Sequence, residues 1–142
     1  MWIFTELGFL SIVRDNFRPG HLLVRARQRD DAVKIADVCS AIASRKIVIL
    51  ETPERDYRFR MSVPIGVISE VIAVLVEGID YANFKDRVHE IDPDPERSIA
   101  YTRVWCEMSD FQRIINTKPP KVKLSSEQRR IRKKNKVNRK RR

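Results

Sequence analysis

Apolar and polar residues alternate over residues 57–63, YRFRMSV. A period of two is typical of a β-strand that buries one face and leaves the other open. The alternation predicts that Tyr57 and Phe59 face a core, whereas Arg58 and Arg60 face away from it. This segment is the clearest strand in the sequence, and we expect the sheet to be built around it.

Three other segments predict strands. Residues 2–14 are rich in aromatic and β-branched residues, and Gly8 marks either a bulge in one long strand or a tight turn between two short strands. Of the two, we expect one long strand that bends at Gly8. Residues 21–28 alternate more weakly, after a turn that contains Pro-Gly. Residues 47–50, IVIL, are a continuous apolar run, which predicts a short central strand buried on both faces.

Helical spacing of apolar residues predicts three longer helices and one short helix. We expect the first to begin at the N-cap residue Asp30 and the second at Pro64, because proline suits a first turn. Asp80 is expected to cap the short helix. The last helix is expected to run from the cap Asp94 to about Ile115, ahead of a Pro-Pro pair.

The predicted order is therefore ββαββα with a further helix. It indicates an α+β fold of two layers, in which a mainly antiparallel four-stranded sheet has its helices on one face. This layering is ferredoxin-like, with a permuted strand order along the chain. We expect residues 1–117 to form the globular domain. Residues 118–142 are expected to form a disordered basic tail, because their few isolated apolar residues cannot build a core.

Charge divides the chain at the same position. The 142 residues carry a net charge of +10. Residues 118–142 hold 13 Lys and Arg against one acid, giving +12, whereas residues 1–117 hold 16 basic residues against 18 acids, giving −2. A cationic arm on a nearly neutral domain suits polyanions, with nucleic acid first and an anionic membrane surface second.

The basic tail is the first candidate site. Each Lys or Arg can contact a phosphate of DNA or RNA and release counterions. Sequence specificity is not expected, because the tail has no aromatic residue to stack on bases. A solubilising extension without a dedicated partner is the alternative. The predicted nucleic-acid contacts are Lys121, Lys123, Arg129, Arg130, Arg132, Lys133, Lys134, Lys136, Arg139, Lys140, Arg141 and Arg142.

The polar sides of two strands form the second candidate site. If helices cover the face that bears Phe59, the open face carries four arginines, Arg25, Arg27, Arg58 and Arg60. Open sheet faces that bind RNA pair arginine with stacking aromatics, but here Tyr57 and Phe59 are expected to point into the core.

We therefore expect an ordinary solvated face, paired with acids such as Glu6 or Glu51. A protein interface is the alternative, because arginine is enriched at interfaces. The partner would then be a protein or a ribonucleoprotein. The phrase Asp80–Lys85 is a separate candidate, in which Asp80 as a cap and Tyr81 and Phe84 as packing residues explain most of the pattern. Asn83 and Lys85 are its exposed remainder and are the residues that would contact a partner.

Catalytic chemistry is not indicated. His21 and His89 are far apart, no Ser-His-Asp or Cys-His arrangement is visible, and the four glycines form no phosphate loop. We expect no enzymatic activity, no cofactor and no metal. Cys39 and Cys106 lie in apolar helical patterns and are expected to be small buried residues, which fits a reducing cytoplasm. No apolar run reaches the roughly 20 residues of a membrane span. Nucleic acid is the expected partner of the tail, and a membrane is not.

Several phrases occur together in this chain: MWIFT with GFLSIV, VRAR, DYRFR, IDYANFK, and Tyr101 followed by the pair VW. As a set they resemble a family of short bacterial and phage-borne proteins of about this size, over roughly residues 1–112. The resemblance implies a prokaryotic, cytosolic setting and assigns no activity. The family pattern ends near Gln112, so the basic tail is the part in which this chain differs from it.

Overall fold

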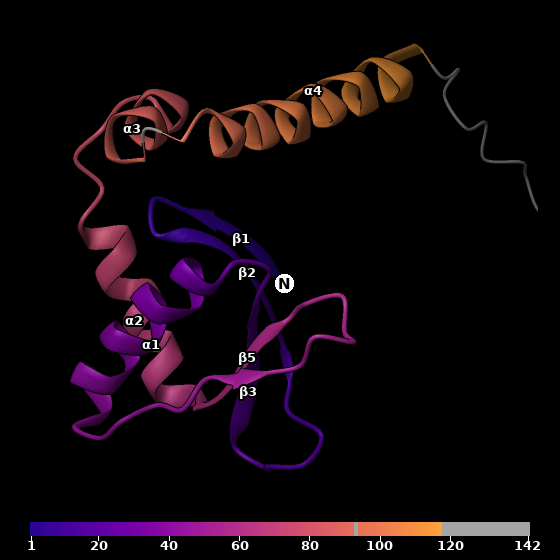
Figure 1. Ribbon diagram of the computed structural model, residues 1–142. Helices are drawn as coiled ribbons and strands as arrows, with labels where there is room; N and C mark the ends of the chain where they lie inside the picture. The colour runs from indigo at the N-terminus through magenta and orange to yellow at the C-terminus, as the bar shows by residue number, and fades with distance from the viewer. Residues whose placement is uncertain (93, 118–142) are drawn as a thin grey trace, which may run out of the picture. The chain divides into compact units, whose positions relative to one another are not determined.

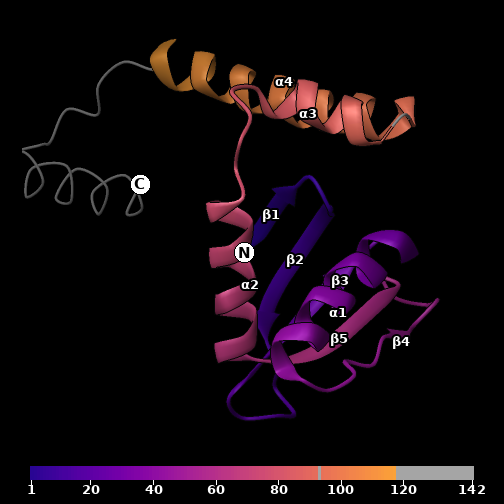
Figure 2. The ribbon, with the colours of Figure 1, turned by 90° about the vertical axis from the view of Figure 1, so that its left-hand side faces the viewer.

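The computed structural model describes residues 1–92 and 94–117 (Figures 1 and 2). Within them the fold is α+β, with four helices and an open, antiparallel five-stranded sheet of order β1-β2-β3-β5-β4. The strands are β1 (Trp2–Thr5), β2 (Gly8–Arg14), β3 (His21–Ala26), β4 (Leu50–Glu51) and β5 (Phe59–Pro64). The helices are α1 (Arg29–Ala43), α2 (Ile65–Glu77), α3 (Phe84–Ile91) and α4 (Pro95–Thr117).

The register of the strands gives the sheet two chemically different faces. Leu10 of β2 pairs with Ala26 of β3, which pairs with Phe59 of β5, and all three side chains are buried. In the next row of the sheet, Ser11 pairs with Arg25, which pairs with Arg60. Because neighbouring residues of a strand point to opposite faces, this second row belongs to the other side of the sheet.

Helices α1 and α2 cover the apolar face and complete the core (Figure 1). Figure 2, which looks onto the helix side, shows α1 in front of β3 and β5. Ile35 of α1 and Val71 of α2 are completely buried, as is Met61 of β5 beneath them. Burying one such side chain contributes about 1.5–3 kcal/mol, so this face holds the sheet and helices together.

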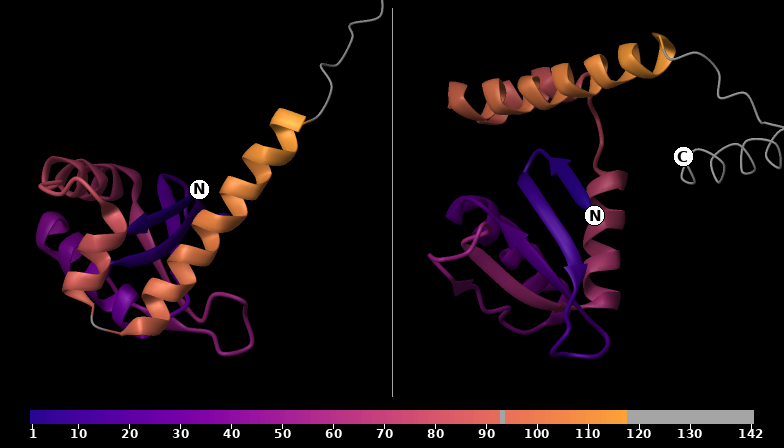
Figure 3. Two further views of the ribbon diagram at one scale, coloured as in Figure 1. Left: turned by 90° about the horizontal axis from the view of Figure 1, so that it is seen from above. Right: turned by 90° about the vertical axis from the view of Figure 1, so that its right-hand side faces the viewer.

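The N-terminal segment forms two strands, so the expectation of one bent strand was wrong. β1 and β2 make a hairpin (Figure 3, right), and in its register Thr5 pairs with Gly8. The Thr5 hydroxyl donates to the Gly8 carbonyl, and Oγ1 accepts the backbone N–H groups of Leu7 and Gly8 at 3.2 Å. Thr5 thus supplies the turn chemistry, and Gly8 adopts a φ of 145° that other residues avoid.

The apolar run 47–50 is not a central strand. Only Leu50 and Glu51 pair with β5, so β4 is a short edge strand, and 59% of Leu50 is exposed. Ile47 is buried, but its N–H donates to the Ser40 hydroxyl of α1 instead of a strand. The run therefore serves as a connection from α1 to the edge of the sheet.

Four other expected boundaries shift. The N-cap of α1 is Gln28, so Asp30 lies in the first turn. The cap of α3 is Asn83, whose Oδ1 accepts the Lys85 N–H at 3.0 Å, so Asp80 does not cap this helix. β5 begins at Phe59, two residues after the start of the alternation. Pro64 is the N-cap residue of α2, which begins at Ile65, one residue later than expected.

The chain forms two compact units, and the boundary between them falls between Ser98 and Ile99, inside α4. The first residues of α4 belong with the sheet and α1–α3. Residues 99–117 form the remaining turns of the helix and carry several exposed apolar side chains, among them Met108 and Phe111. The predicted tail, residues 118–142, lies outside the described residues, and the division at 117 stays a prediction.

Candidate nucleic-acid interface

Arginine occupies the centre of the open face. Arg25 lies opposite Ser11 of β2 and Arg60 of β5. Its Nη2 donates to the Ser11 hydroxyl at 2.7 Å, and Ser11 is almost fully buried. The guanidinium is therefore fixed by a hydrogen bond to a neighbour in the same row. A fixed guanidinium loses less conformational freedom when it contacts a ligand.

Two guanidiniums contact the ring of Tyr57. The Cζ atoms of Arg25 and Arg27 each lie 4.6 Å from the centroid of its ring, and Arg27 also donates to the Asp56 carbonyl at 3.0 Å. Each cation–π contact of this kind contributes about 0.5–2 kcal/mol. These contacts with Arg25 and Arg27 place Tyr57 on the open side of the sheet, although only 3% of the residue is exposed.

An aromatic cluster continues this surface across β1 and β2. The rings of Phe4 and Phe9 stack with centroids 4.6 Å apart, and Trp2 meets Phe9 edge-on at 5.8 Å. Phe9 in turn lies 6.3 Å from Tyr57. Trp2 is opposite Ser11 and therefore shares a row with Arg25, and 68% of its surface is exposed.

The sequence prediction for the aromatics was therefore half right. Phe59 does point into the core, but Tyr57 precedes β5, so the alternation does not control its direction. Trp2, Phe4 and Phe9 were missed because they reach the open face only when residues 2–14 fold back as a hairpin. The signal was the Thr5-Glu6-Leu7-Gly8 turn, in which threonine is followed three residues later by glycine.

Arg58 and Arg60 are held by local acids. Arg58 Nη2 contacts Glu51 Oε1 at 2.6 Å, which is one of the pairings expected for an ordinary solvated face. Arg60 donates to the Tyr57 carbonyl at 2.9 Å and pairs with Asp56 at 3.3 Å. The other expected acid, Glu6, pairs with Arg87 of α3 instead.

A cleft of about 530 Å³ opens at the far end of the same face. Leu23 and Ser62, which pair with each other across β3 and β5, belong to its lining. Its other side is formed by the turn before β3 and the connection between α1 and β4. Three exposed cations line it, Arg18, Arg45 and Lys46.

Asp15 is the acid that lines this cleft. The Ser62 hydroxyl donates to its Oδ2 at 2.5 Å, and the Phe17 N–H donates to Oδ1 at 2.9 Å. These bonds, the serine bond first, lower the pKa of the Asp15 carboxyl from its ordinary value. The Asp15 carboxylate is therefore hydrogen-bonded to Ser62 and to the turn between β2 and β3. The three cations of the cleft are exposed to solvent.

Two polar atoms of the cluster formed by Arg25, Arg27 and Tyr57 are buried without a hydrogen-bond partner among the described residues. They are the Tyr57 hydroxyl and Arg25 Nε. Buried donors are satisfied in the great majority of cases, because leaving one unpaired costs about 1–3 kcal/mol. Both atoms belong to the same cluster on the open face. This cluster therefore contains two buried polar atoms that have no hydrogen-bond partner among the described residues.

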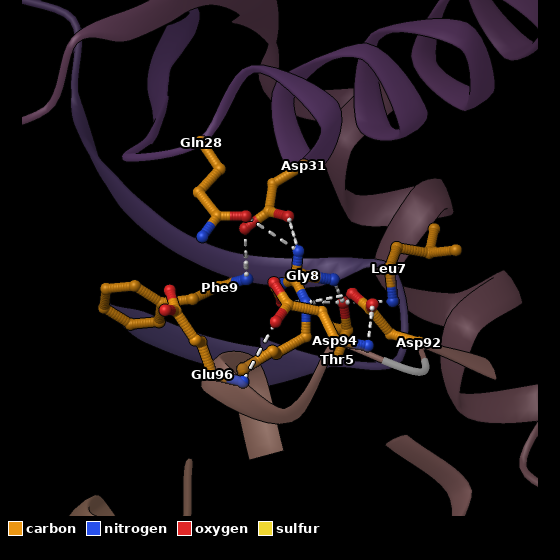
Figure 4. A network of polar contacts seen from close by, with 10 residues as sticks. Thr5, Leu7, Gly8, Phe9, Gln28, Asp31, Asp92, Asp94 and Glu96 are labelled. Carbon is orange, nitrogen blue, oxygen red and sulfur yellow. Dashed lines mark hydrogen bonds and ion pairs between the residues drawn. The ribbon is translucent and has the colours of Figure 1, made fainter. Parts of the chain in front are cut away.

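A buried ion-pair network fixes the hairpin that carries the aromatics (Figure 4). Asp31 of α1 accepts the Phe9 N–H at 3.0 Å through Oδ2 and pairs with Arg97 Nη2 at 2.7 Å through Oδ1. Arg97 also contacts Asp92 Oδ2 at 2.5 Å and Gln28 Oε1 at 3.0 Å. Asp31 and Arg97 are both buried, so this network ties β2, α1 and the start of α4 together.

The remaining predicted residues lie elsewhere. Asn83 is the cap of α3, and the Lys85 N–H is bonded to it, so both belong to the α3 terminus and neither lies on the sheet. All twelve predicted contacts of the tail fall in residues 118–142, outside the described residues. Cys39 is buried, and burial raises the pKa of its thiol to about 11, but Cys106 is exposed, contrary to expectation.

Other chemistry is sparse in residues 1–92 and 94–117. No group of three His, Cys, Asp or Glu side chains is placed to hold a metal ion in this part of the chain. No described helix is long and apolar enough to cross a membrane. Comparison with protein-family models, with curated proteins and with solved structures gave no match. The candidate site therefore stands on its own geometry.

Proposed function

We propose that this chain is a non-enzymatic nucleic-acid-binding protein in which residues 118–142 make electrostatic contacts to phosphates. The observation that carries the proposal is the segregation of charge, with +12 in residues 118–142 and −2 in residues 1–117. Thirteen cations in 25 residues attract a polyanion at long range and release its counterions on contact. A cytoplasmic location belongs to the same proposal.

The composition of the open sheet face supports nucleic acid as the polyanion. Arginine and aromatic side chains lie together there, with Arg25 and Arg27 against the ring of Tyr57 and an exposed Trp2 beside Phe9. Proteins that bind nucleic acid through an open sheet use this pair of residue types for phosphates and bases. A simple solubilising arm would not require such a face.

The salt dependence of binding tests the proposal. The variant replaces Arg129, Arg130, Arg132, Lys133 and Lys134 by Gln in the full-length chain, and a labelled oligonucleotide reports binding by fluorescence anisotropy. An arm that contacts about 6–10 phosphates loses roughly 10³–10⁵ in affinity between 50 and 200 mM salt. The variant should bind more weakly with a shallower slope. Equal affinity and slope in both proteins would refute the role of the arm.

The alternative function is a protein-interaction module that uses the arginines predicted for the open face of the sheet. Arg58 is the residue to test, because its side chain and that of its partner Glu51 are each about half exposed, and its guanidinium lies over the ring of Phe59 at 5.8 Å rather than over Tyr57. Arg58→Glu should abolish capture of a protein partner and leave nucleic-acid binding unchanged. Purification from nuclease-treated and untreated lysate separates the two functions. Only the nucleic-acid-binding function predicts that nuclease removes the co-purifying material.

A further inference from the structure

We propose that the open face of the sheet binds a short single-stranded segment of nucleic acid, with a base on Trp2 and phosphates at Arg27 and in the basic cleft. The inference rests on the proposed function and adds the form of the ligand and its place on the domain. It differs from the arm contacts because it requires unpaired bases. The residues that carry it all belong to the described sheet and its connecting turns.

Trp2 is the stacking platform. It is 68% exposed, and its ring is braced edge-on by Phe9 at 5.8 Å, which itself contacts Tyr57. The backbone of β1 is paired with β2 on one side, so the indole is presented from a fixed strand. Stacking on an aromatic is tolerant of base identity, because every base has a π-face.

Arg25 and Arg27 supply the positive charge beside this platform. Arg25 lies in the same row of the sheet as Trp2, and Arg27 is exposed. The Tyr57 hydroxyl and Arg25 Nε are donors without a protein acceptor in the described structure. A ligand phosphate that draws Arg27 away from the tyrosine ring would offer these donors an acceptor. The unsatisfied donors therefore point to a polar ligand at this cluster.

The cleft continues the path. The row that contains Leu23 and Ser62 lies two residues along the strands from the row of Trp2 and Arg25, a distance of about 7 Å. From there Arg18, Arg45 and Lys46 line the cleft, while Asp15 is engaged by Ser62 and the turn backbone. A strand of a few nucleotides reaches from the indole to these cations.

A single strand fits this surface better than a duplex or an acidic protein segment. Stacking on Trp2 needs an unpaired base, and a duplex presents only its edges and phosphates in the grooves. An acidic peptide would satisfy the cations in the cleft, but it has no planar base to cover the indole. The combination of an exposed Trp2 and flanking arginines therefore selects unpaired nucleic acid.

The test compares full-length variants on three labelled probes: oligo-dT and oligo-U of about 15 nucleotides, and a duplex of the same length. Trp2→Ala should lower affinity for both single strands by about 5- to 100-fold and leave the duplex unchanged. Trp2→Phe should keep most of the affinity. Trp105→Ala is the matched control, because it removes another exposed tryptophan from α4. Equal thermal midpoints establish that the variants fold.

The cleft has its own test. Arg45→Gln with Lys46→Gln should reduce the salt slope for single strands by about 1.4, at about 0.7 per phosphate. Arg29→Gln with Lys34→Gln removes the same charge from α1, which covers the opposite face, and should leave the slope unchanged. An equal change in both double variants would refute a phosphate path through the cleft.

The outcomes separate this inference from the function proposed above. If the arm variant loses binding and Trp2→Ala does not, the arm proposal stands and the sheet proposal is overturned. If Trp2→Ala loses single-strand binding and the arm variant does not, the reverse holds. If neither variant alters nucleic-acid binding, or if the full-length chain binds an acidic peptide in preference to all three probes, both proposals are overturned.

Discussion

Replacing Arg97 should lower the free energy of unfolding more than replacing any other arginine of the unit Met1–Ser98. Only 8% of Arg97 is exposed, and its partner Asp31 is 2% exposed. Arg97→Met removes the cation and leaves the Asp31 carboxylate buried without its ion pair. Breaking a buried pair in this way costs about 3–5 kcal/mol, a large share of the roughly 5–15 kcal/mol by which a domain is stable.

Equilibrium urea unfolding of the full-length chain measures this loss. Arg87→Met is the matched control, because Arg87 pairs with Glu6 at 3.1 Å through side chains that are each about one third exposed. Water screens that pair, so its removal should cost much less. The midpoint should fall strongly for Arg97→Met and slightly for Arg87→Met, with the slope unchanged in both.

A double variant sharpens the reasoning. Asp31→Asn removes the charge that Arg97→Met would leave unpaired, while the amide oxygen can still accept the Phe9 N–H. The combined variant should therefore lose less than the sum of the two single losses, by an interaction of about 0.5–3 kcal/mol. Strict additivity, or an Arg97→Met loss no larger than that of Arg87→Met, would refute the account of a buried pair.

Two further predictions concern Gly8 in the β1–β2 hairpin and Asp15 in the turn between β2 and β3. Gly8→Ala should destabilise the protein by about 1–3 kcal/mol or more in urea unfolding, because a Cβ would lie 2.2 Å from Asp31 Cγ at a φ of 145°; Gly66→Ala in α2, where nothing lies within 4 Å, should be neutral or stabilising. The lowered pKa of Asp15 means that its bonds stabilise the fold above the ordinary carboxyl pKa of 3.8, and this contribution is lost as pH falls through the lower folded value. Ser62→Ala should therefore reduce the difference in stability between neutral and acid pH, and an unchanged acid limb of the stability curve would contradict this.

The sequence predicted the parts of the fold that local periodicity controls. Phe59, Met61 and Val63 are buried on one face of β5, as their alternation indicated, and Arg60 faces the other way. The run 47–50 misled because a continuous apolar segment has no periodicity to tell a strand from a buried connection. The path of this run depends on Ser40 of α1, whose hydroxyl accepts a hydrogen bond from the Ile47 N–H.

The candidate site was predicted only in part, because its members are distant in sequence. Arg25 and Arg60 meet through strand pairing, and the alternation anticipated that they share a face. Trp2 and Phe9 join them only after the chain reverses at Glu6 and Leu7, which no single-strand pattern reveals. Arg97 lies 66 residues from Asp31, and nothing in its local sequence distinguishes it from a solvated helical arginine.

The buried network and the open face are parts of one construction. Asp31 projects from α1 on the covered side, yet it holds the N–H of Phe9, whose ring lies on the open side. Because successive strand residues point to opposite faces, fixing the backbone of Phe9 from below fixes its ring above. Phe9 in turn braces Trp2 and contacts Tyr57. Loss of Arg97 therefore should loosen the stacking platform as well as the core, so Asp31→Asn, which keeps the acceptor for Phe9, should preserve single-strand binding better than Arg97→Met.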